Sequence, residues 1–442
     1  ELGRFTEVSN FQRVDLDGSL AGKGFTLETA NFQLDALIPK VGINGYNYTN
    51  IETDGTFAES FFNGQVDVND PMFKLFATGS VDLRDNNKIF KLRGRLDTAL
   101  LKEVKLTEED MELSTSFDLD ISGLKLDSIQ GKIDLTETFY RYESQSIDLD
   151  SVYFGASRGA TGRKLTVSSD LFYADFNGDF EFSEISRELS NISEQYRLQF
   201  SSRSDEVAQF IRRNPRTSNN FNMNYQFELY DITPLIHIFD STIYVSKNTN
   251  IDGRFTNENN ESIVLNTKID TVQFGKINFY DNEININATN IRDQEKVLAL
   301  GYISSEKQVY ANSTETDKMV FEAVWDGTHM DLRQNVTQLS SGNYAEIGAD
   351  LNFFPDRTEL RFGNSNITIL EETWQITDNN VVVFGDEKIT IENLSVFNTD
   401  QSISFDGNIA IAQDTAQSLS IEFQEVEVAN INPLANESYT GR

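Results

Sequence analysis

The stretch ADFNGDFEF, residues 174–182, decides the fold class of this chain. Its even positions are apolar or glycine: Ala174, Phe176, Gly178, Phe180 and Phe182. Its odd positions are polar: Asp175, Asn177, Asp179 and Glu181. Successive side chains of a β-strand point to opposite faces, so a period of two predicts a strand with one apolar and one polar face.

The same alternation recurs along most of the chain, in FNMNYQFEL (221–229), EININA (283–288), EKITIE (387–392) and SISFDGNIAI (402–411). SLSIEFQEVEV (418–428) changes phase between Phe423 and Val426, which predicts a bulge or a tight turn. Asp-Gly and Asn-Gly pairs punctuate the runs as turn signals, although Asn177-Gly178 lies inside a run and is interpreted as a strand glycine. We therefore predict an all-β chain.

One region departs from this pattern. In residues 183–199 the apolar side chains Ile185, Leu189, Ile192 and Tyr196 follow helical spacing, and residues 204–214 form a second helical stretch that stops before Pro215. Residues 232–242 favour a third short helix, capped by Thr233. We predict a β-groove segment over 1–183, a helical insert over 184–216 and a second β-groove segment over 217–442.

Composition excludes several functional classes. The formal net charge is -33 and the pI about 4.4, so a nucleic acid would be repelled. The absence of cysteine removes disulfides, thiol catalysis and cysteine-ligated zinc. No signal peptide and no apolar run of the roughly 20 residues that a spanning helix needs is visible. We expect either a cytosolic protein or a mature or internal segment, and the abrupt ends ELGRF and ESYTGR favour a segment.

No catalytic motif stands out. The two histidines, His237 in PLIHIF and His329 after the turn WDGT, are interpreted as packed or surface residues. The acids of VDLDGS (14–19) and DLRDNN (82–87) lack a complete calcium loop, and GASRGATGRK (155–164) lacks the ending of a phosphate-binding loop. We expect no enzymatic activity, no metal site and no cofactor.

The apolar face of so many strands must be covered. At about ten residues for a strand and its turn, the chain makes roughly forty strands. At about 4.8 Å per strand, one continuous sheet would extend on the order of 190 Å. Stacked β-sandwiches, a solenoid or a curled trough that holds lipid chains would each cover the apolar face. The sequence lacks a short solenoid period, and the alternation alone leaves the trough and the sandwich array open.

Several long phrases resemble the TamB family, the periplasmic subunit of the bacterial translocation and assembly module. They are residues 231–255, 372–411 and 426–434, and in 372–411 the likeness rests on Trp374, Asn380, Phe384, Ile391, Asn393, Leu394, Asn398, Gln401 and Gly407. Residues 46–83, 128–135 and 168–182 are similar to TamB-like proteins of Bacteroidetes. These are diffuse strand patterns that cover nearly the whole chain.

The resemblance implies an elongated curled antiparallel β-sheet, or β-taco, with an apolar interior and a short helical insert. It implies a periplasmic, bridge-like conduit that carries phospholipid between the inner and the outer membrane. A BamA-like (TamA-like) outer-membrane barrel protein is the implied partner, with a linked role in outer-membrane protein assembly and secretion. The inner-membrane anchor is expected outside this segment. The alternative function is a bacterial surface β-sandwich array that binds glycan or protein.

The alternation selects the side chains expected to line the lipid-binding groove. They are Phe176, Phe180, Phe182, Phe221, Met223, Tyr225, Phe227, Ile389, Ile391, Ile403, Phe405 and Ile409.

Overall fold

The computed structural model describes residues 11–23, 29, 31–84, 88–160, 162–200, 204–214, 220–258, 260–291, 296–311, 314–369, 371–411 and 417–426. Strands make up 70% of it and helices 8%, which confirms the predicted all-β class. The chain divides into two compact units. Unit 1 comprises residues 1–179 and 227–241, and unit 2 comprises residues 180–226 and 242–442.

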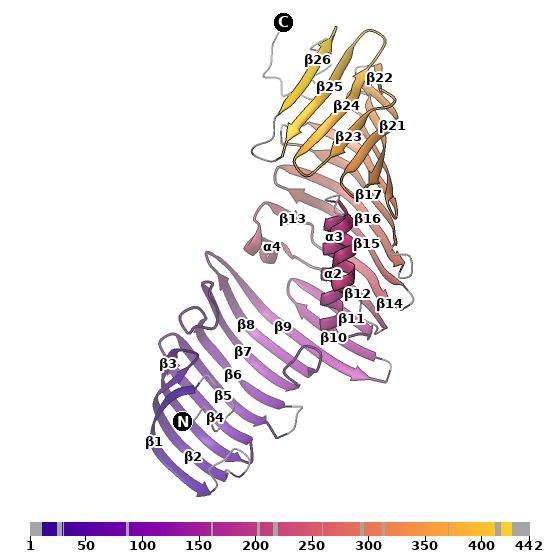
Figure 1. Ribbon diagram of the computed structural model, residues 1–442. Helices are drawn as coiled ribbons and strands as arrows, with labels where there is room; N and C mark the ends of the chain where they lie inside the picture. The colour runs from indigo at the N-terminus through magenta and orange to yellow at the C-terminus, as the bar shows by residue number, and fades with distance from the viewer. Residues whose placement is uncertain are drawn as a thin grey trace. The chain divides into compact units, whose positions relative to one another are not determined.

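Unit 1 is a curled antiparallel sheet in which each strand pairs with the next one along the chain (Figure 1). One short helix, α4 (Thr233–Phe239), belongs to the same unit. The strands are β1 (Phe11–Lys23), β2 (Asn31–Ile43), β3 (Tyr46–Ala58), β4 (Phe61–Asp70), β5 (Phe73–Asp82), β6 (Ile89–Leu100), β7 (Met111–Ser122), β8 (Gln130–Tyr142), β9 (Gln145–Gly159), β10 (Gly162–Ser169) and β11 (Phe172–Asp179).

Unit 2 contains the helices α2 (Phe182–Phe200) and α3 (Ser204–Arg213) and the remaining antiparallel strands. The chain passes from unit 2 into unit 1 within β12 (Phe221–Leu229). The remaining strands are β13 (Ile243–Val245), β14 (Thr249–Asn257), β15 (Glu261–Phe274), β16 (Ile277–Ile291), β17 (Lys296–Val309), β18 (Glu315–Asp326), β19 (His329–Gln338), β20 (Asn343–Phe353), β21 (Thr358–Ile369), β22 (Glu372–Ile376), β23 (Val381–Phe384), β24 (Lys388–Phe397), β25 (Ser402–Ala410) and β26 (Ser418–Gln424).

Pairing in unit 2 also follows the order of the chain, with two exceptions. Strand β13 joins β14 in pairing with β15. Strands β22 and β23 both lie between β21 and β24, as two short pieces of one interrupted strand. A sandwich array requires strands that alternate between two sheets, and this sequential pairing is the pattern of a continuous sheet instead.

A stripe of glycines explains why the unit 1 sheet curls. Gly55, Gly64 and Gly79 are successive cross-strand partners on β3, β4 and β5. A Cβ atom on Gly64 would lie 2.3 Å from the backbone oxygen of Asp54, and one on Gly79 would lie 2.0 Å from that of Lys91. Only a residue without a side chain fits such a close approach of two strands, so these glycines permit a sharper bend.

Bulges keep the apolar side chains on one face where the alternation fails. In β24 the register with β25 shifts between Ile391 and Leu394, and Asn393 adopts a positive φ of 54°. One extra residue exchanges the two faces of a strand, so Leu394 points to the same side as Ile391. The predicted phase change after Phe423 also has a structural counterpart, because β26 ends at Gln424 and Glu425 has a φ of 52°.

Several sequence predictions need correction. Strand β11 ends at Asp179, and Phe182 begins helix α2 instead of ending a strand. Thr233 is the first residue of α4 and not its cap; Ile232 holds the cap position without a side-chain hydrogen bond. The described residues form 26 strands where roughly forty were expected, because many strands are longer than assumed; β9 and β16 each have 15 residues. Of the two acidic stretches considered as calcium loops, the side chains of residues 14–19 and residues 85–87 of the stretch 82–87 lie outside the described part of the chain.

Candidate functional site

The candidate site is the apolar face of each sheet. Directly opposed residues of antiparallel strands share a face, so the register traces that face from strand to strand. In unit 2 one unbroken row of eleven apolar residues and one glycine crosses twelve strands. The row consists of Phe255, Ile263, Ala288, Ala299, Trp325, Met330, Leu351, Leu360, Val382, Ile391, Gly407 and Leu419.

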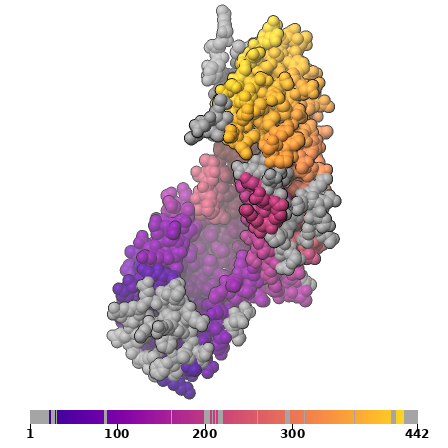
Figure 2. All heavy atoms as spheres, viewed as in Figure 1, coloured from indigo at the N-terminus to yellow at the C-terminus, as the bar shows by residue number. Residues whose placement is uncertain are grey.

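Unit 1 has an equivalent row. It consists of Leu34, Gly55, Gly64, Gly79, Leu92, Leu119, Ile133, Phe154, Val167 and Ala174. The side chains of Leu34, Leu92, Leu119 and Ile133 are half-buried. A dry core buries such residues almost completely, so this face keeps apolar surface within reach of a guest molecule. In the space-filling view, the described atoms of unit 1 recede from the viewer between nearer edges (Figure 2).

Helix α4 covers one end of the apolar face of unit 1. Its residue Ile238 is buried against Ile147 and Leu171, and Leu235 packs on the same cluster. The ring of Phe239 lies 6.5 Å from that of Tyr142 while its own side chain is 80% exposed. Helix α4 therefore covers only the part of the face around this cluster. None of the residues of the apolar row from β2 to β11 belongs to the cluster.

Helix α2 covers part of the apolar face of unit 2 (Figure 1). The ring of Tyr196 lies 5.0 Å from that of Trp325 and packs on a buried cluster with Val297 and Phe353. Beside this contact, the buried Asn290 of β16 donates a hydrogen bond to the Gln195 side chain of α2 at 3.2 Å. A buried polar contact between helix and sheet fixes the helix at one position, because sliding it would leave polar groups unsatisfied.

A hollow remains on the same face, beyond the residues that α2 contacts. Its volume is about 260 Å³, just below the roughly 300–1,000 Å³ that is typical of ligand pockets. It is lined by side chains of β18 to β21: Thr316, Val336, Thr337, Gln338, Asn343, Tyr344, Ala345, Ile347, Ile367, Thr368 and Ile369. Val336, Ala345 and Ile367 are successive cross-strand partners, so the hollow belongs to the apolar face.

The structure brings five of the residues predicted from sequence together in unit 2. Ile389 and Ile391 lie on β24, and Ile403, Phe405 and Ile409 lie on β25. All five are half-buried and share the apolar face, with Ile389 directly opposite Ile409. They continue onto β26, where Ile421 is 46% exposed opposite Phe405, and Phe423 is 62% exposed opposite Ile403.

The other predicted lining residues are distributed differently. Phe180, Phe221 and Met223 are buried, and the ring of Phe221 packs 4.9 Å from that of Phe255. Phe182 opens α2 and contacts Phe180, with ring centroids 5.1 Å apart. Tyr225 is half-buried and donates its hydroxyl to the backbone oxygen of Val264 at 2.6 Å. Phe176 and Phe227, both half-buried in unit 1, make an edge-to-face pair at 5.5 Å.

Sequence reasoning missed the residues that line the hollow. Ile347 and Ile367 occur in the alternating stretches 343–353 and 358–369, so the signal was present. The register of β20 against β21 shifts between Ile347 and Ala349, and this shift decides which of their side chains share a face. Alternation within one strand does not reveal such a shift.

The opposite faces are polar and charged. In unit 1, Lys91 lies 3.5 Å from Asp120 of the neighbouring strand, and Lys132 lies 3.4 Å from Asp134. Such exposed pairs contribute little stability, and their consequence is a solvated outer surface. Each sheet therefore has one face for water and one for apolar matter.

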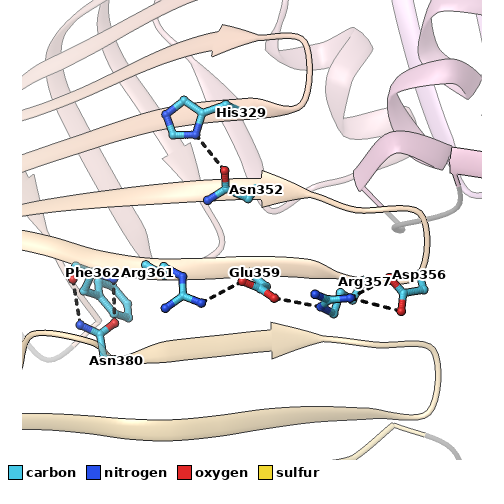
Figure 3. A network of polar contacts seen from close by, with 8 residues as sticks. All are labelled: His329, Asn352, Asp356, Arg357, Glu359, Arg361, Phe362 and Asn380. Atoms are coloured by element: carbon cyan, nitrogen blue, oxygen red, sulfur yellow. Dashed lines mark hydrogen bonds and ion pairs between the residues drawn. The ribbon is translucent and has the colours of Figure 1, made fainter.

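A polar network follows β21 on this charged side of unit 2 (Figure 3). Glu359 accepts hydrogen bonds from Arg357 at 2.9 Å and from Arg361 at 3.0 Å. Burial alone would raise the pKa of the Glu359 carboxyl, but the two guanidinium groups outweigh it and hold the pKa below its ordinary value. In the same view His329 faces Asn352 on the adjacent strands β19 and β20.

The residues that carry the family resemblance have structural roles. Asn380 is buried at the break between β22 and β23, where it accepts a hydrogen bond from the Phe362 N–H and donates to the Phe362 oxygen, both at 2.8 Å (Figure 3). Trp374 is buried. A Cβ atom on Gly407, whose φ is 127°, would clash with the backbone oxygen of Ser418. These positions hold the interrupted strand and its bulge in place.

Comparisons with known proteins add no identification. No helix among the described residues is long and apolar enough to cross a membrane. No protein-family model, curated protein or solved structure matches the chain.

Proposed function

We propose that this chain binds the hydrocarbon chains of lipids along the apolar faces of its two sheets. The observation that carries the proposal is apolar surface that is not sealed in a dry core. The row of unit 1 is half-buried from Leu34 to Val167, and the row of unit 2 is half-buried over β24 to β26. The middle of the unit 2 row, with Trp325 and Met330, is buried and is not part of this surface. Each methylene that moves from water onto such a face contributes about 0.8 kcal/mol. An acyl chain therefore gains most of its affinity from the apolar surface area that it removes from water.

The same physics supports transport over storage. Apolar contact is non-directional, so a lipid that moves by one strand exchanges one set of equivalent contacts for another. The polar head group stays in water, because burying it without partners would cost several kcal/mol. Together with the resemblance to the TamB family, this favours a periplasmic conduit that carries phospholipid between the inner and the outer membrane, with a BamA-like barrel protein as partner. No catalytic step is required of the protein.

The test compares two charges on opposite faces of one strand. Phe405→Asp places a carboxylate on the apolar face of β25, and Ser404→Asp places the same charge on the other face one residue away. We expect Phe405→Asp to lower the amount of phospholipid that co-purifies, measured by native mass spectrometry, and to weaken binding of a fluorescent fatty acid. Ser404→Asp is expected to bind as the unmodified chain does.

A third variant separates lost binding from lost folding. Ile421 is 46% exposed on the same face, so Ile421→Asp adds a charge there without burying it. We expect its thermal unfolding to match that of the unmodified chain while its lipid binding falls. Unchanged lipid binding in both Phe405→Asp and Ile421→Asp would refute the proposal.

A further inference from the structure

Three side chains on the polar face of unit 2 point their donor atoms at one another. His329 and Asp331 lie on β19, and Asp350 lies on β20 directly opposite Asp331. The His329 Nε2 atom is 3.3 Å from an Asp331 oxygen and 3.5 Å from an Asp350 oxygen. All three donor atoms lie within 4.8 Å of one another.

Among the described residues, acids also oppose each other elsewhere, as Asp35 opposes Asp54, but here a histidine lies beside the pair. Elsewhere a base commonly opposes an acid, as Lys268 opposes Glu283 between β15 and β16. Here one carboxylate directly opposes another, which is unfavourable. Arg361 lies opposite Asp350 on β21, but its guanidinium donates to Glu359 at 3.0 Å. A cation held between the two carboxylates and the imidazole would offset the repulsion.

The distances match tetrahedral coordination. Zinc binds histidine nitrogen and carboxylate oxygen at about 2.0–2.2 Å, and the edges of a tetrahedron with such bonds are about 3.3–3.6 Å. The two nitrogen–oxygen separations, 3.3 and 3.5 Å, lie in that interval. The donors therefore need little movement to take up an ion.

The imidazole ring is oriented for this task. Its Nδ1 atom lies 3.2 Å from the Asn352 side-chain oxygen, which can only accept, so Nδ1–H donates and Nε2 faces the carboxylates (Figure 3). Metal-binding histidines use such a hydrogen bond to fix ring and tautomer. From the sequence, His329 is interpreted as a packed or surface residue and no metal site is expected; the register of β20 against β19 is what brings Asp350 beside it.

Space for a fourth ligand lies beside the two carboxylates. A hollow of about 450 Å³ is lined by Asp331 and Asp350, together with Arg333, Glu322 and three small residues or glycines. The hollow is open at Gly363, where an added Cβ atom would lie 3.9 Å from its nearest neighbour, an Asp350 oxygen. We propose that His329, Asp331 and Asp350 form a binding site for a divalent transition-metal ion, with Zn²⁺ as the probe and an open coordination position toward this hollow.

The two histidines of the chain make the test specific. In the full chain labelled with ¹⁵N-histidine, one equivalent of Zn²⁺ is expected to shift the ring nitrogen signals of His329 and to leave those of His237 unchanged. An excess of Mg²⁺, which prefers oxygen ligands, is expected to shift neither. If Zn²⁺ shifts both histidines equally, or neither, the site does not exist.

A second acidic pair controls for diffuse binding to the acidic surface. Asp35 and Asp54 are also cross-strand partners that line a hollow, of about 330 Å³ in unit 1, but no histidine lines it. We expect Asp350→Asn to weaken Zn²⁺ binding by about tenfold or more in calorimetric titration, and Asp54→Asn to leave it unchanged. Equal weakening by both substitutions would overturn the proposal.

Discussion

The substitution Asp70→Asn tests how one end of the unit 1 sheet is held together. Asp70 is 1% exposed at the end of β4. Its carboxylate accepts four hydrogen bonds: from the Tyr46 hydroxyl at 2.7 Å, the Thr49 hydroxyl at 2.8 Å, the Met72 N–H at 2.9 Å and the Thr49 N–H at 3.0 Å. Each carboxylate oxygen accepts one backbone N–H and one hydroxyl.

The expected magnitude follows from this geometry. An asparagine in either orientation turns its NH₂ group toward one backbone N–H and one hydroxyl. The hydroxyl can rotate and accept, but the N–H cannot, and a buried unsatisfied donor costs about 1–3 kcal/mol. The remaining bonds also lose the assistance of the negative charge. We therefore expect a loss of about 3 kcal/mol in the free energy of unfolding of unit 1 at pH 7.

The same carboxylate predicts a pH dependence. Burial alone would raise the pKa of Asp70, but the hydrogen bonds from Tyr46, Met72 and Thr49 outweigh it, so the folded pKa lies below its ordinary value. The stabilisation is therefore complete above the unfolded pKa, about 3.9, and is lost as the pH falls through the lower folded value. The pKa of Tyr46 is raised to about 12 by burial and by Asp70. Its contribution is complete below about pH 10 and is lost as the pH rises toward 12.

Hydrogen–deuterium exchange measures the effect locally. Both tryptophans, Trp325 and Trp374, belong to unit 2, so their fluorescence serves as an internal control while exchange is followed in peptides from β3 to β5. Asp67→Asn, at an exposed position of the same strand, is the matched control and is expected to change stability by less than about 0.5 kcal/mol. Equal protection of β3 to β5 in the two variants would refute the reasoning.

Two further substitutions test the close approach of strands in unit 1 and the packing of α2 against the sheet. Gly94→Ala is expected to lower the thermal unfolding midpoint, because its Cβ atom would lie 2.0 Å from the Phe76 oxygen and overpacking costs about 1–3 kcal/mol. Gly301→Ala, where the nearest atom is 3.8 Å away, is the control, and an equal loss in both would contradict the explanation. Gln195→Ala is expected to weaken the docking of α2 by about 1–2 kcal/mol, seen as faster amide exchange in α2; unchanged exchange would show that Tyr196 alone holds the helix.

The fold class was predictable because the period of two is a local signal. Every strand carries it within its own sequence, and the apolar residues of 402–411 lie on one face as the alternation indicates. The phase change after Phe423 was visible in the sequence, but the bulge at Asn393 was not, because it depends on a positive φ and on the partner strand. Strand length was underestimated for a related reason: Asp54-Gly55 and Asn63-Gly64, interpreted as turn signals, lie inside β3 and β4.

The way in which α2 packs against the sheet could not be predicted from the sequence either. Helical spacing gave the apolar stripe Ile185, Leu189, Ile192 and Tyr196, yet Leu189 is 40% exposed while Glu188 and Gln195 are buried. A pattern of hydrophobic residues does not place polar side chains inside the protein. Gln195 is buried because it meets a polar side chain of the sheet, Asn290, and this pairing connects residues 95 positions apart.

The family resemblance and the binding proposal rest on different residues. Asn380, Trp374 and Gly407 hold an interrupted strand and a bulge, so a likeness at these positions concerns the backbone path and not the cargo. A one-residue slip in any strand would turn its apolar side chains to the solvent. The bulge at Asn393 prevents this slip and keeps Leu394 in line with Ile391. These structural residues therefore keep the apolar row continuous. The paired substitutions Phe405→Asp and Ser404→Asp test whether lipid binding depends on that face of β25.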